Sequence, residues 1–276
     1  MKGKRLDPLK NEETRLVLRS FHEGTFEIKP RIVYVDEEGH QMVSELEPVA
    51  IKVSKIVLPR RTNTGFDGLD NLLFGGIPEN YSVILTSPSC DERDFLIKSF
   101  LETGAREGQI TFYITTKAIG VENLAEKFQS NLYLFICNPQ AETIVKDLPN
   151  VYRLKGVENL TDISIALTSA FRRLHKPPKT TRRACVEIVS DVLLQHNAVQ
   201  TRRWLNALLP EFKSKGFTTL AVIDPGMHSS QEVRAVLDLF EGEISIYEKE
   251  TETGVKKFLK IKKMYDQKHF KNELPM

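Results

Sequence analysis

Short apolar segments alternate with polar ones over the first 60 residues. The segments are rich in β-branched residues and partly alternating, which is typical of strands; they cover residues 16–18, 26–28, 32–35 and 49–53. Gly39 follows two glutamates and predicts a hairpin turn, because glycine adopts positive φ at no steric cost. Three or four strands of this length are marginally stable alone. We therefore expect residues 1–60 to form a small β region for oligomerisation or partner binding.

Beyond a polar linker, apolar strand-like segments alternate with segments of helical periodicity through residues 61–276. The predicted strands cover residues 81–85, 110–114, 132–137, 185–189 and 218–223. Helices are predicted at residues 91–107 and 121–128, around Leu167, and around Trp204,. Strands that alternate with helices imply βαβ units around a mostly parallel sheet. A final hairpin is predicted from residues 244–248 and 256–264. The sequence thus predicts one large α/β domain after the small all-β region.

Composition excludes several classes of protein. The 276 residues include 39 Lys and Arg against 37 Asp and Glu, a formal net charge of +2, so the chain is not a generic polycation,. Its three cysteines lie far apart without a CxxC pair, and its six histidines show no ligand spacing, so we expect no metal site and a reducing compartment,. We find no signal peptide and no apolar run of membrane-spanning length. The expectation is a cytoplasmic protein with no membrane partner.

The most informative segment lies between the linker and the first strand of the large domain. It starts at Thr64 and reads TGFDGLDNLLFGGIP; a strand follows, and residues 87–94 then open a helix. The segment resembles the lead-in of the KaiC/RadA-like branch of the RecA ATPase superfamily, in which a strand and the Walker A phosphate loop follow. Residues 159–167 and 257–264 resemble the family's fourth helix and terminal hairpin. The resemblance implies a RecA-like sheet flanked by helices and points to an archaeal source.

The residues at the phosphate-loop positions depart from the family pattern. A phosphate loop needs small residues so that backbone N–H groups can wrap the phosphates, a Lys on the phosphates and a Ser or Thr on Mg²⁺. By the resemblance, Ser87 stands for the first Gly, Glu92 for the second-last Gly, Arg93 for the Lys and Asp94 for the Mg²⁺-binding Thr. Carboxylates would repel a polyphosphate, and an Arg does not replace the Lys. We expect no nucleotide cofactor here.

Other catalytic positions agree with this expectation. Lys117 stands where the family usually has one of two water-activating glutamates. The predicted strand at 185–189 ends in Ser190-Asp191, where the family has Asp-Ser, so Asp191 is the candidate for a shifted Walker B acid. Glu187 is the alternative if the strand has another register. Tyr265 replaces the family's terminal Arg. The resemblance with these losses predicts a degenerate P-loop ATPase fold that does not hydrolyse ATP.

Two basic runs stand out against the balanced charge. One follows the predicted helix around Leu167, and the other occupies the carboxy-terminal hairpin and tail. Solubility explains such runs as well as contact with phosphate backbones does, which would give salt-dependent binding. The candidates for nucleic-acid contact are Lys176, Lys179, Arg182, Arg183, Lys256, Lys257, Lys260, Lys262, Lys263 and Lys268.

Three functional hypotheses follow if the fold is retained and ATP hydrolysis is lost. The first is a catalytically inactive KaiC-like homodimer or higher oligomer that docks on and regulates a nucleic-acid-containing assembly, for which the ribosome or one of its subunits is the best guess. A two-fold dimer presents two identical patches and can bridge two copies of a partner or block its assembly. The second is a nucleotide sensor that binds without Mg²⁺ through Arg93 and the Lys-rich hairpin. The third is an adaptor of an active RecA-like recombination or signalling protein.

Overall fold

The computed structural model describes residues 24–36, 38–54, 56–174, 181–251 and 254–276. The chain divides into two units, Met1–Lys55 and Ile56–Met276, each compact by itself. This division falls five residues before the boundary expected from the linker. The strand predicted at residues 16–18 lies outside the described residues.

The described part of the first unit is an antiparallel ribbon. Strand β1 (Gly24–Ile28) pairs with β4 (Val49–Val53), and β2 (Arg31–Val35) pairs with β3 (Gln41–Glu45). Gly39 lies in the β2–β3 turn with φ of 87°, which confirms the predicted hairpin. Strand β3 was not predicted; its sequence is too polar to stand out, and pairing with β2 across the turn makes it a strand.

The register between β1 and β4 separates apolar from polar side chains. Residues directly opposite each other share a face of a ribbon. Phe26 lies opposite Ile51 and Ile28 opposite Val49, so one face of this ladder is apolar. The other face carries Thr25 opposite Lys52 and Glu27 opposite Ala50. In the described part of this unit the apolar face is open: 40% of Phe26 and 52% of Val49 are exposed.

The second unit is built on a nine-stranded sheet in its described part, with strand order β10-β9-β8-β11-β12-β7-β13-β14-β15. Neighbours from β10 to β13 are parallel, and β14 and β15 are antiparallel additions. The strands are β7 (Ser82–Thr86), β8 (Ile110–Thr115), β9 (Leu132–Cys137), β10 (Val151–Leu154), β11 (Arg182–Val186), β12 (Phe217–Ile223), β13 (Gly242–Thr251), β14 (Gly254–Met264) and β15 (Leu274–Pro275). A separate short pair, β5 (Arg61–Thr62) with β6 (Ile77–Pro78), lies in the lead-in.

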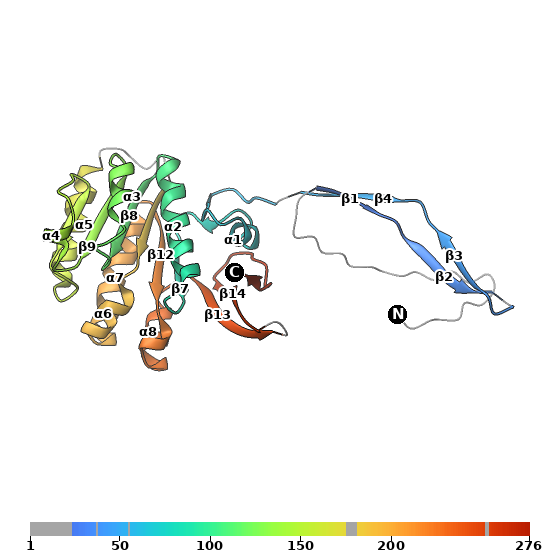
Figure 1. Cartoon of the computed structure of the whole chain (residues 1–276). Coiled ribbons are helices and arrows are strands. Elements are labelled where there is room, and N and C mark those ends of the chain that lie inside the picture. Colours follow the sequence, from blue (N-terminus) through green and yellow to red (C-terminus); the bar gives the residue numbers. More distant parts are fainter. Residues whose placement is uncertain (1–23, 37, 55, 175–180, 252–253) are drawn as a thin grey trace. The chain divides into compact units, whose positions relative to one another are not determined.

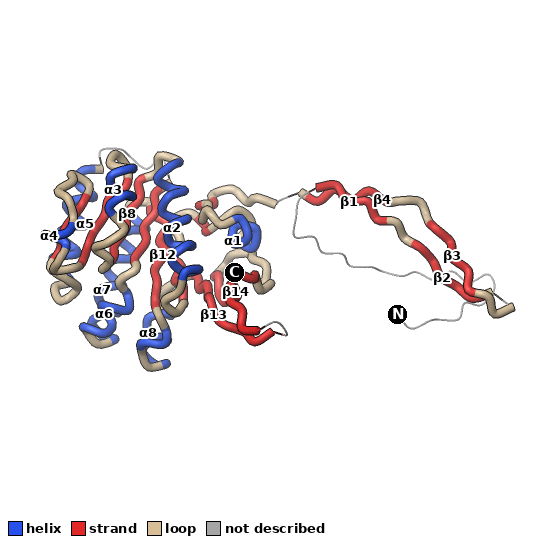
Figure 2. Tube along the Cα trace, viewed as in Figure 1, coloured by secondary structure: helices blue, strands red, loops and turns tan. Residues whose placement is uncertain are grey.

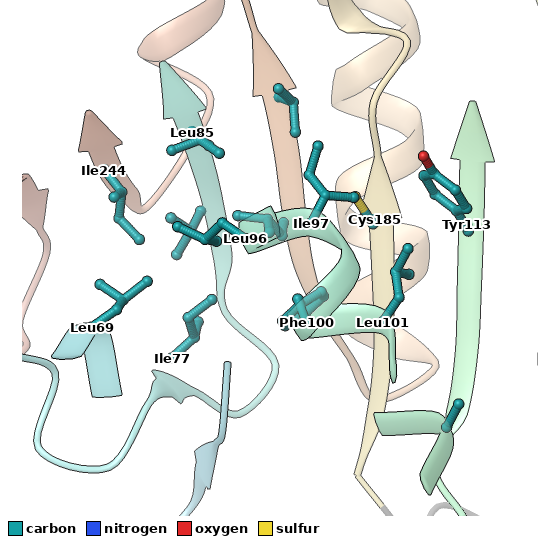
Figure 3. Close-up of a cluster of buried hydrophobic side chains, with 14 of the residues drawn as sticks. Leu69, Ile77, Leu85, Leu96, Ile97, Phe100, Leu101, Tyr113, Cys185 and Ile244 are labelled. Atoms are coloured by element: carbon teal, nitrogen blue, oxygen red, sulfur yellow. The ribbon is translucent and has the colours of Figure 1, made fainter. Parts of the chain in front are cut away.

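Helices cover both faces of this sheet (Figures 1 and 2). The first group contributes to one buried cluster and consists of α1 (Asp67–Leu72), α2 (Asp91–Arg106), α3 (Glu122–Lys127) and α4 (Ala141–Ile144). The second group packs on the other face and consists of α5 (Leu160–Arg173), α6 (Val189–Gln195), α7 (Ala198–Ser214) and α8 (Ser230–Leu237). Figure 3 shows Leu96 of α2 on the side of Leu85 of β7, and Ile97 of α2 beside Cys185 of β11; all belong to one buried cluster. The predicted α/β, RecA-like architecture is confirmed.

One predicted strand was placed wrongly. Strand β11 covers Arg182–Val186 instead of residues 185–189, and Val189 already begins α6. The apolar run from Ala184 to Val189 contains both the end of a strand and the start of a helix, and periodicity cannot separate two such short segments.

No helix in the described ranges has the length and apolar character needed to cross a membrane.

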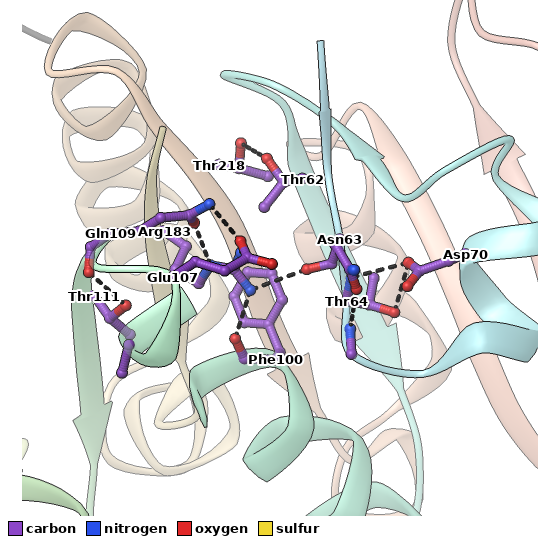
Figure 4. A network of polar contacts seen from close by, with 12 residues as sticks. Thr62, Asn63, Thr64, Asp70, Phe100, Glu107, Gln109, Thr111, Arg183 and Thr218 are labelled. Carbon is purple, nitrogen blue, oxygen red and sulfur yellow. Dashed lines mark hydrogen bonds and ion pairs between the residues drawn. The ribbon is translucent and has the colours of Figure 1, made fainter. Parts of the chain in front are cut away.

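The lead-in motif has structural roles. The backbone N–H and the Oγ1 of buried Thr64 both donate to Oδ1 of Asp70 at 2.8 Å (Figure 4). Gly76 has φ of 123°, and a Cβ there would lie 2.2 Å from the carbonyl oxygen of Thr62. Leu69 and Ile77 are fully buried. Each of these residue types is therefore required by packing or backbone geometry.

A fully buried arginine joins the lead-in to helix α2 and strand β11. Nη1 of Arg183 donates to the carbonyl oxygens of Asn63 at 2.9 Å and Phe100 at 2.7 Å, and its Nε donates to Oε1 of Gln109 at 2.8 Å (Figure 4). The guanidinium also lies 4.9 Å from the centre of the Phe100 ring. Burial lowers the pKa of Arg183 to about 10. Its three hydrogen bonds offset only part of the cost of burying this charge,.

Because α2 contacts Arg183 closely, we predict that replacing Gly104 with alanine destabilises the protein, although glycine to alanine usually stabilises a helix. A Cβ at Gly104 would lie 2.2 Å from Nε of Arg183. Gly to Ala inside a helix normally stabilises by about 1 kcal/mol, but here we expect Gly104→Ala to destabilise by about 1–3 kcal/mol through overpacking. Chemical denaturation of G104A measures this, with Lys98→Ala on the exposed face of the same helix as control. A stabilised G104A would contradict the packing described.

Candidate functional site

The carboxyl ends of the parallel strands bring several predicted site residues to one edge of the sheet. Ser87 follows β7, Lys117 follows β8 after one residue, Glu187 follows β11 directly and Asp224 follows β12. Ligands of open α/β sheets bind at this edge. The candidate site is therefore the region between the start of α2 and the ends of β8 and β11.

Ser87, at the first phosphate-loop position, makes its hydrogen bonds within the protein. It is fully buried, and its backbone N–H donates to the carbonyl oxygen of Ile223 at 3.0 Å. Its Oγ donates to the carbonyl oxygen of Pro88 at 2.8 Å. Both donors of Ser87 are thus used within the protein.

Glu92 places a carboxylate at the start of α2. Nζ of Lys257, on β14, lies 2.9 Å from its Oε2. The pKa of Glu92 is lowered first by this ammonium and then by a hydrogen bond from its own backbone N–H. A helix N-terminus is a ready-made anion site, and here the first turn carries the chain's own carboxylate. Asp91 and Asp94 add negative charge to the same first turn.

Arg93, Asp94, Lys117 and Glu187 form a chain of alternating charges. Nζ of Lys117 lies 3.0 Å from Oδ1 of Asp94 and 2.8 Å from Oε1 of Glu187. Nε of Arg93 lies 3.6 Å from the same Asp94 oxygen, and its Nη2 donates to Oγ of Ser89 at 2.9 Å. Burial opposes the charge on Lys117, but Glu187 and Asp94 raise its pKa above the ordinary value. Lys117 therefore stays protonated between two carboxylates.

Glu187 is held through both of its oxygens. Oε1 contacts Lys117, and Oε2 accepts hydrogen bonds from the hydroxyls of Tyr113 at 2.5 Å and Thr115 at 2.7 Å. Burial, with Glu187 close by, raises the pKa of Tyr113 well above its usual value, so this phenol remains a donor. The carboxylate of Glu187 is fixed on three sides.

The position of Glu187 corrects the choice of Walker B acid. Because β11 ends at Val186, Glu187 is the carboxylate at the end of the strand, while Asp191 lies in the first turn of α6. Burial and then Glu187 raise the pKa of Asp191. The alternative register considered for this segment is the observed one, and the signal that could have found it is the basic pair 182–183, which begins the strand.

The residues at this edge do not fit Mg-ATP, the ligand that the resemblance implies. A polyphosphate would meet the side chain and charge of Glu92 where a glycine is required, and Asp94 offers a carboxylate in place of a hydroxyl. The ammonium of Lys117 already lies between the two carboxylates nearest the ends of β8 and β11. The first turns of α2 and α6 and the end of β11 carry the carboxylates of Asp91, Glu92, Asp94, Asp191 and Glu187, whereas the cations paired with them are Arg93, Lys117 and Lys257. In the described ranges no three His, Cys, Asp or Glu residues are grouped to hold a metal ion.

The first basic run does not form a nucleic-acid surface where the structure describes it. Lys176 and Lys179 lie outside the described residues. Arg182 and Arg183 were predicted as contacts, but both are buried. Nη1 of Arg182 donates to the carbonyl oxygen of Lys215 at 3.0 Å. The prediction is wrong for these two arginines because β11, which they begin, is an interior strand of the sheet.

The second basic run is exposed only in part. Lys257 pairs with Glu92, and Nζ of Lys262 lies 2.9 Å from Oε1 of Glu243. Lys260 lies 4.2 Å from the centre of the Tyr247 ring, and Lys263 donates to the carbonyl oxygen of Leu237 at 3.2 Å. The remaining two candidates, Lys256 and Lys268, are exposed and form no ion pair with the described residues.

Comparison with known proteins agrees with the fold and the motifs. A solved structure, that of a KaiC-like protein, PH0186, from the hyperthermophilic archaeon Pyrococcus horikoshii OT3, superimposes with a TM-score of 0.61 at 20% identity; the match covers 78% of this chain and 94% of that chain. A search of curated proteins found no match. The family model described as "ATPase: KaiC" matches residues 62–276. The chain therefore belongs to the KaiC family of ATPases.

Proposed function

We propose that this protein is a catalytically silent, self-associating member of the KaiC family that docks on a nucleic-acid-containing assembly, the ribosome or one of its subunits, and regulates it by bridging or blocking assembly. The main support for this proposal is that the protein's own side chains fill the site: Lys117 bridges Asp94 and Glu187, and Glu92 lies at the start of α2. A KaiC fold without its chemistry retains surfaces for binding.

The contacts of Glu187 support the loss of hydrolysis. By the resemblance Glu187 stands at the Walker B position, which holds Mg²⁺, and both of its oxygens already accept contacts from Lys117, Tyr113 and Thr115. Phosphoryl transfer depends on positioned positive charge around the phosphates. The start of α2 presents three carboxylates instead.

Nucleotide addition tests this part of the proposal. We expect millimolar Mg-ATP to leave the melting temperature unchanged and phosphate release to stay at the background of the buffer. Binding at 100 times the dissociation constant would add about 2.7 kcal/mol of stability. A variant with Glu92→Gly, Arg93→Lys, Asp94→Thr and Lys117→Glu, which restores the family's residues, serves as the comparison. A clear ATP-induced rise in melting temperature of the wild type would favour the nucleotide-sensor alternative.

Self-association rests on the ribbon of the first unit. One face of the β1–β4 ladder carries Phe26, Ile28, Val49 and Ile51, and this face is open in the described part of the unit. A two-stranded ribbon is marginally stable by itself. Packing two such faces together removes apolar area from water at roughly 25 cal/mol per Å². A second copy of the chain carries the same apolar ribbon face, so it is a suitable partner for this face.

Lysine substitutions on the two faces of the ribbon test self-association. We expect the wild type to be a dimer or larger by size-exclusion chromatography with light scattering. Phe26→Lys with Ile51→Lys should raise the dissociation constant at least about tenfold, because charged groups must be buried for the faces to meet. Thr25→Lys with Ala50→Lys adds the same charge on the polar face and should leave the mass unchanged. Equal masses for the two double variants would contradict the proposal.

Docking on a nucleic acid is supported by the exposed cations of the carboxy-terminal region. Lys256 and Lys268 are exposed and carry no ion pair with the described residues, so their charge is available. Lysine contacts with phosphates give binding that weakens with salt and reads little sequence. A symmetric dimer carries two sets of these lysines and can hold two copies of a partner.

Co-sedimentation with ribosomal subunits over a salt series tests docking. We expect co-migration at low salt that is lost as salt rises. Lys256→Glu with Lys268→Glu should weaken binding and lower the slope of log affinity against log salt by about two. Lys98→Glu with Lys146→Glu changes two exposed lysines elsewhere and should behave as the wild type. Absence of co-migration at low salt would refute this partner.

A further inference from the structure

We propose that one face of the β13–β14 hairpin binds unpaired nucleotides of RNA, with bases stacked on the rings of Tyr247 and Phe258 and phosphates contacted by Lys249, Lys256 and Lys260. These five residues define the aromatic hairpin face. The inference rests on the proposed docking on a nucleic-acid-containing assembly and deepens it, because it names the part of the nucleic acid that is bound. The hairpin lies at the end of the sheet opposite to β10 (Figure 1).

The antiparallel register places both rings and all three lysines on the same face. Tyr247 lies directly opposite Phe258, and Lys249 lies directly opposite Lys256. Residues two apart in a strand share a face, so Lys260, two residues after Phe258, belongs to this face as well. The centres of the two rings are 6.4 Å apart.

The hydrophobic core does not account for the two rings. Their neighbours Ile246 and Leu259 point to the other face of the hairpin and are buried in the cluster that includes α2. Neither Tyr247 nor Phe258 is among the side chains that form or pack against the two buried clusters of the described residues. Both rings are half-buried. The sheet is therefore uncovered by helices at this position.

Lysine side chains lie over both rings. Nζ of Lys260 is 4.2 Å from the centre of the Tyr247 ring, and Nζ of Lys249 is 5.6 Å from the centre of the Phe258 ring. Such cation–π contacts contribute about 0.5–1 kcal/mol at exposed sites. A lysine has a flexible four-carbon stem, so its ammonium can move from the ring to a phosphate when a base takes its place.

The charges of the aromatic hairpin face favour an anionic ligand. Like charges directly opposite each other destabilise a ladder, yet Lys249 faces Lys256. Glu273, just before β15, lies 2.8 Å from Nζ of Lys249 and compensates its charge. Lys256 is exposed and forms no ion pair with the described residues. Phosphates placed along this face would relieve the remaining repulsion.

Single-stranded RNA supplies both groups that the aromatic hairpin face can bind. Aromatic rings stack on bases of any sequence, and lysines follow the phosphate backbone. Unpaired bases can be splayed out onto a protein ring, whereas the bases of a duplex are stacked on one another. Other RNA-binding sheets stack two or three bases on aromatic side chains of an open face. A protein partner with acidic groups would use the lysines and leave the rings without a role.

Fluorescence anisotropy with a labelled oligouridine tests the inference on the full-length protein. We expect tighter binding of this single strand than of an RNA duplex of equal length. Tyr247→Leu with Phe258→Leu should weaken binding at least about fivefold, the lower end of what one stacked base contributes, and should leave the salt dependence unchanged because no lysine is removed.

Two control variants accompany this measurement. Tyr247→Phe with Phe258→Tyr keeps both rings and should retain the affinity. Tyr265→Leu removes an exposed ring near Lys263, at the other end of β14, and should bind as the wild type does.

Each outcome decides the inference. Equal affinities of the leucine variant and the wild type overturn it, as does equal binding of duplex and single strand. If the leucine variant is unfolded, the wild type is photo-crosslinked to oligouridine that contains 5-iodouridine; a crosslink at Tyr247 or Phe258 supports the inference, and crosslinks elsewhere alone refute it. Co-sedimentation with ribosomal subunits without oligouridine binding refutes this inference and leaves docking intact. Oligouridine binding without co-sedimentation refutes the ribosome as partner and leaves this inference intact.

Discussion

The arrangement of the large domain depends on one buried charge. Arg183 is fully enclosed, and a guanidinium in that position is tolerated only where acceptors surround it. Its acceptors come from the lead-in, from α2 and from the segment before β8, through Asn63, Phe100 and Gln109. These contacts set α2 against the sheet. The direction of α2 in turn determines where Glu92 and Asp94 meet the ends of the neighbouring strands.

This constraint explains why the fold depends on the residues of the lead-in and not on the residues that follow β7. Thr64 and Asp70 hydrogen-bond to each other, Leu69 is buried, and Gly76 approaches the backbone too closely for any side chain. Those requirements belong to the fold and persist whatever the loop does. The residues that follow β7 lie at the carboxyl edge of the sheet, where their charged side chains form ion pairs with other side chains of the protein. Membership of an ATPase family therefore identifies the scaffold, and the chemistry must be judged from the site.

Whether a charged side chain of this protein is already paired matters more than how many charged side chains the protein has. The lysines of β14 form one basic run in the sequence, yet Lys257 and Lys262 are paired with acids, and Lys260 lies on an aromatic ring. A charge that is already paired contributes less to attracting a distant phosphate. The surface that carries unpaired positive charge is consequently smaller than the count of lysines implies.

The sequence by itself determined the class of the fold, the two unequal regions and the acidic start of α2. Hydrophobic periodicity and capping are local, so neighbouring residues are enough to specify them; the strand at residues 132–137 was predicted with its observed ends. Only the tertiary structure decided that Glu187 directly follows β11, that Arg183 is buried, and that Lys117 lies between Asp94 and Glu187. Such contacts join residues far apart in the chain. Their geometry arises when strands and helices pack, because side chains on separate elements have no fixed distance until then.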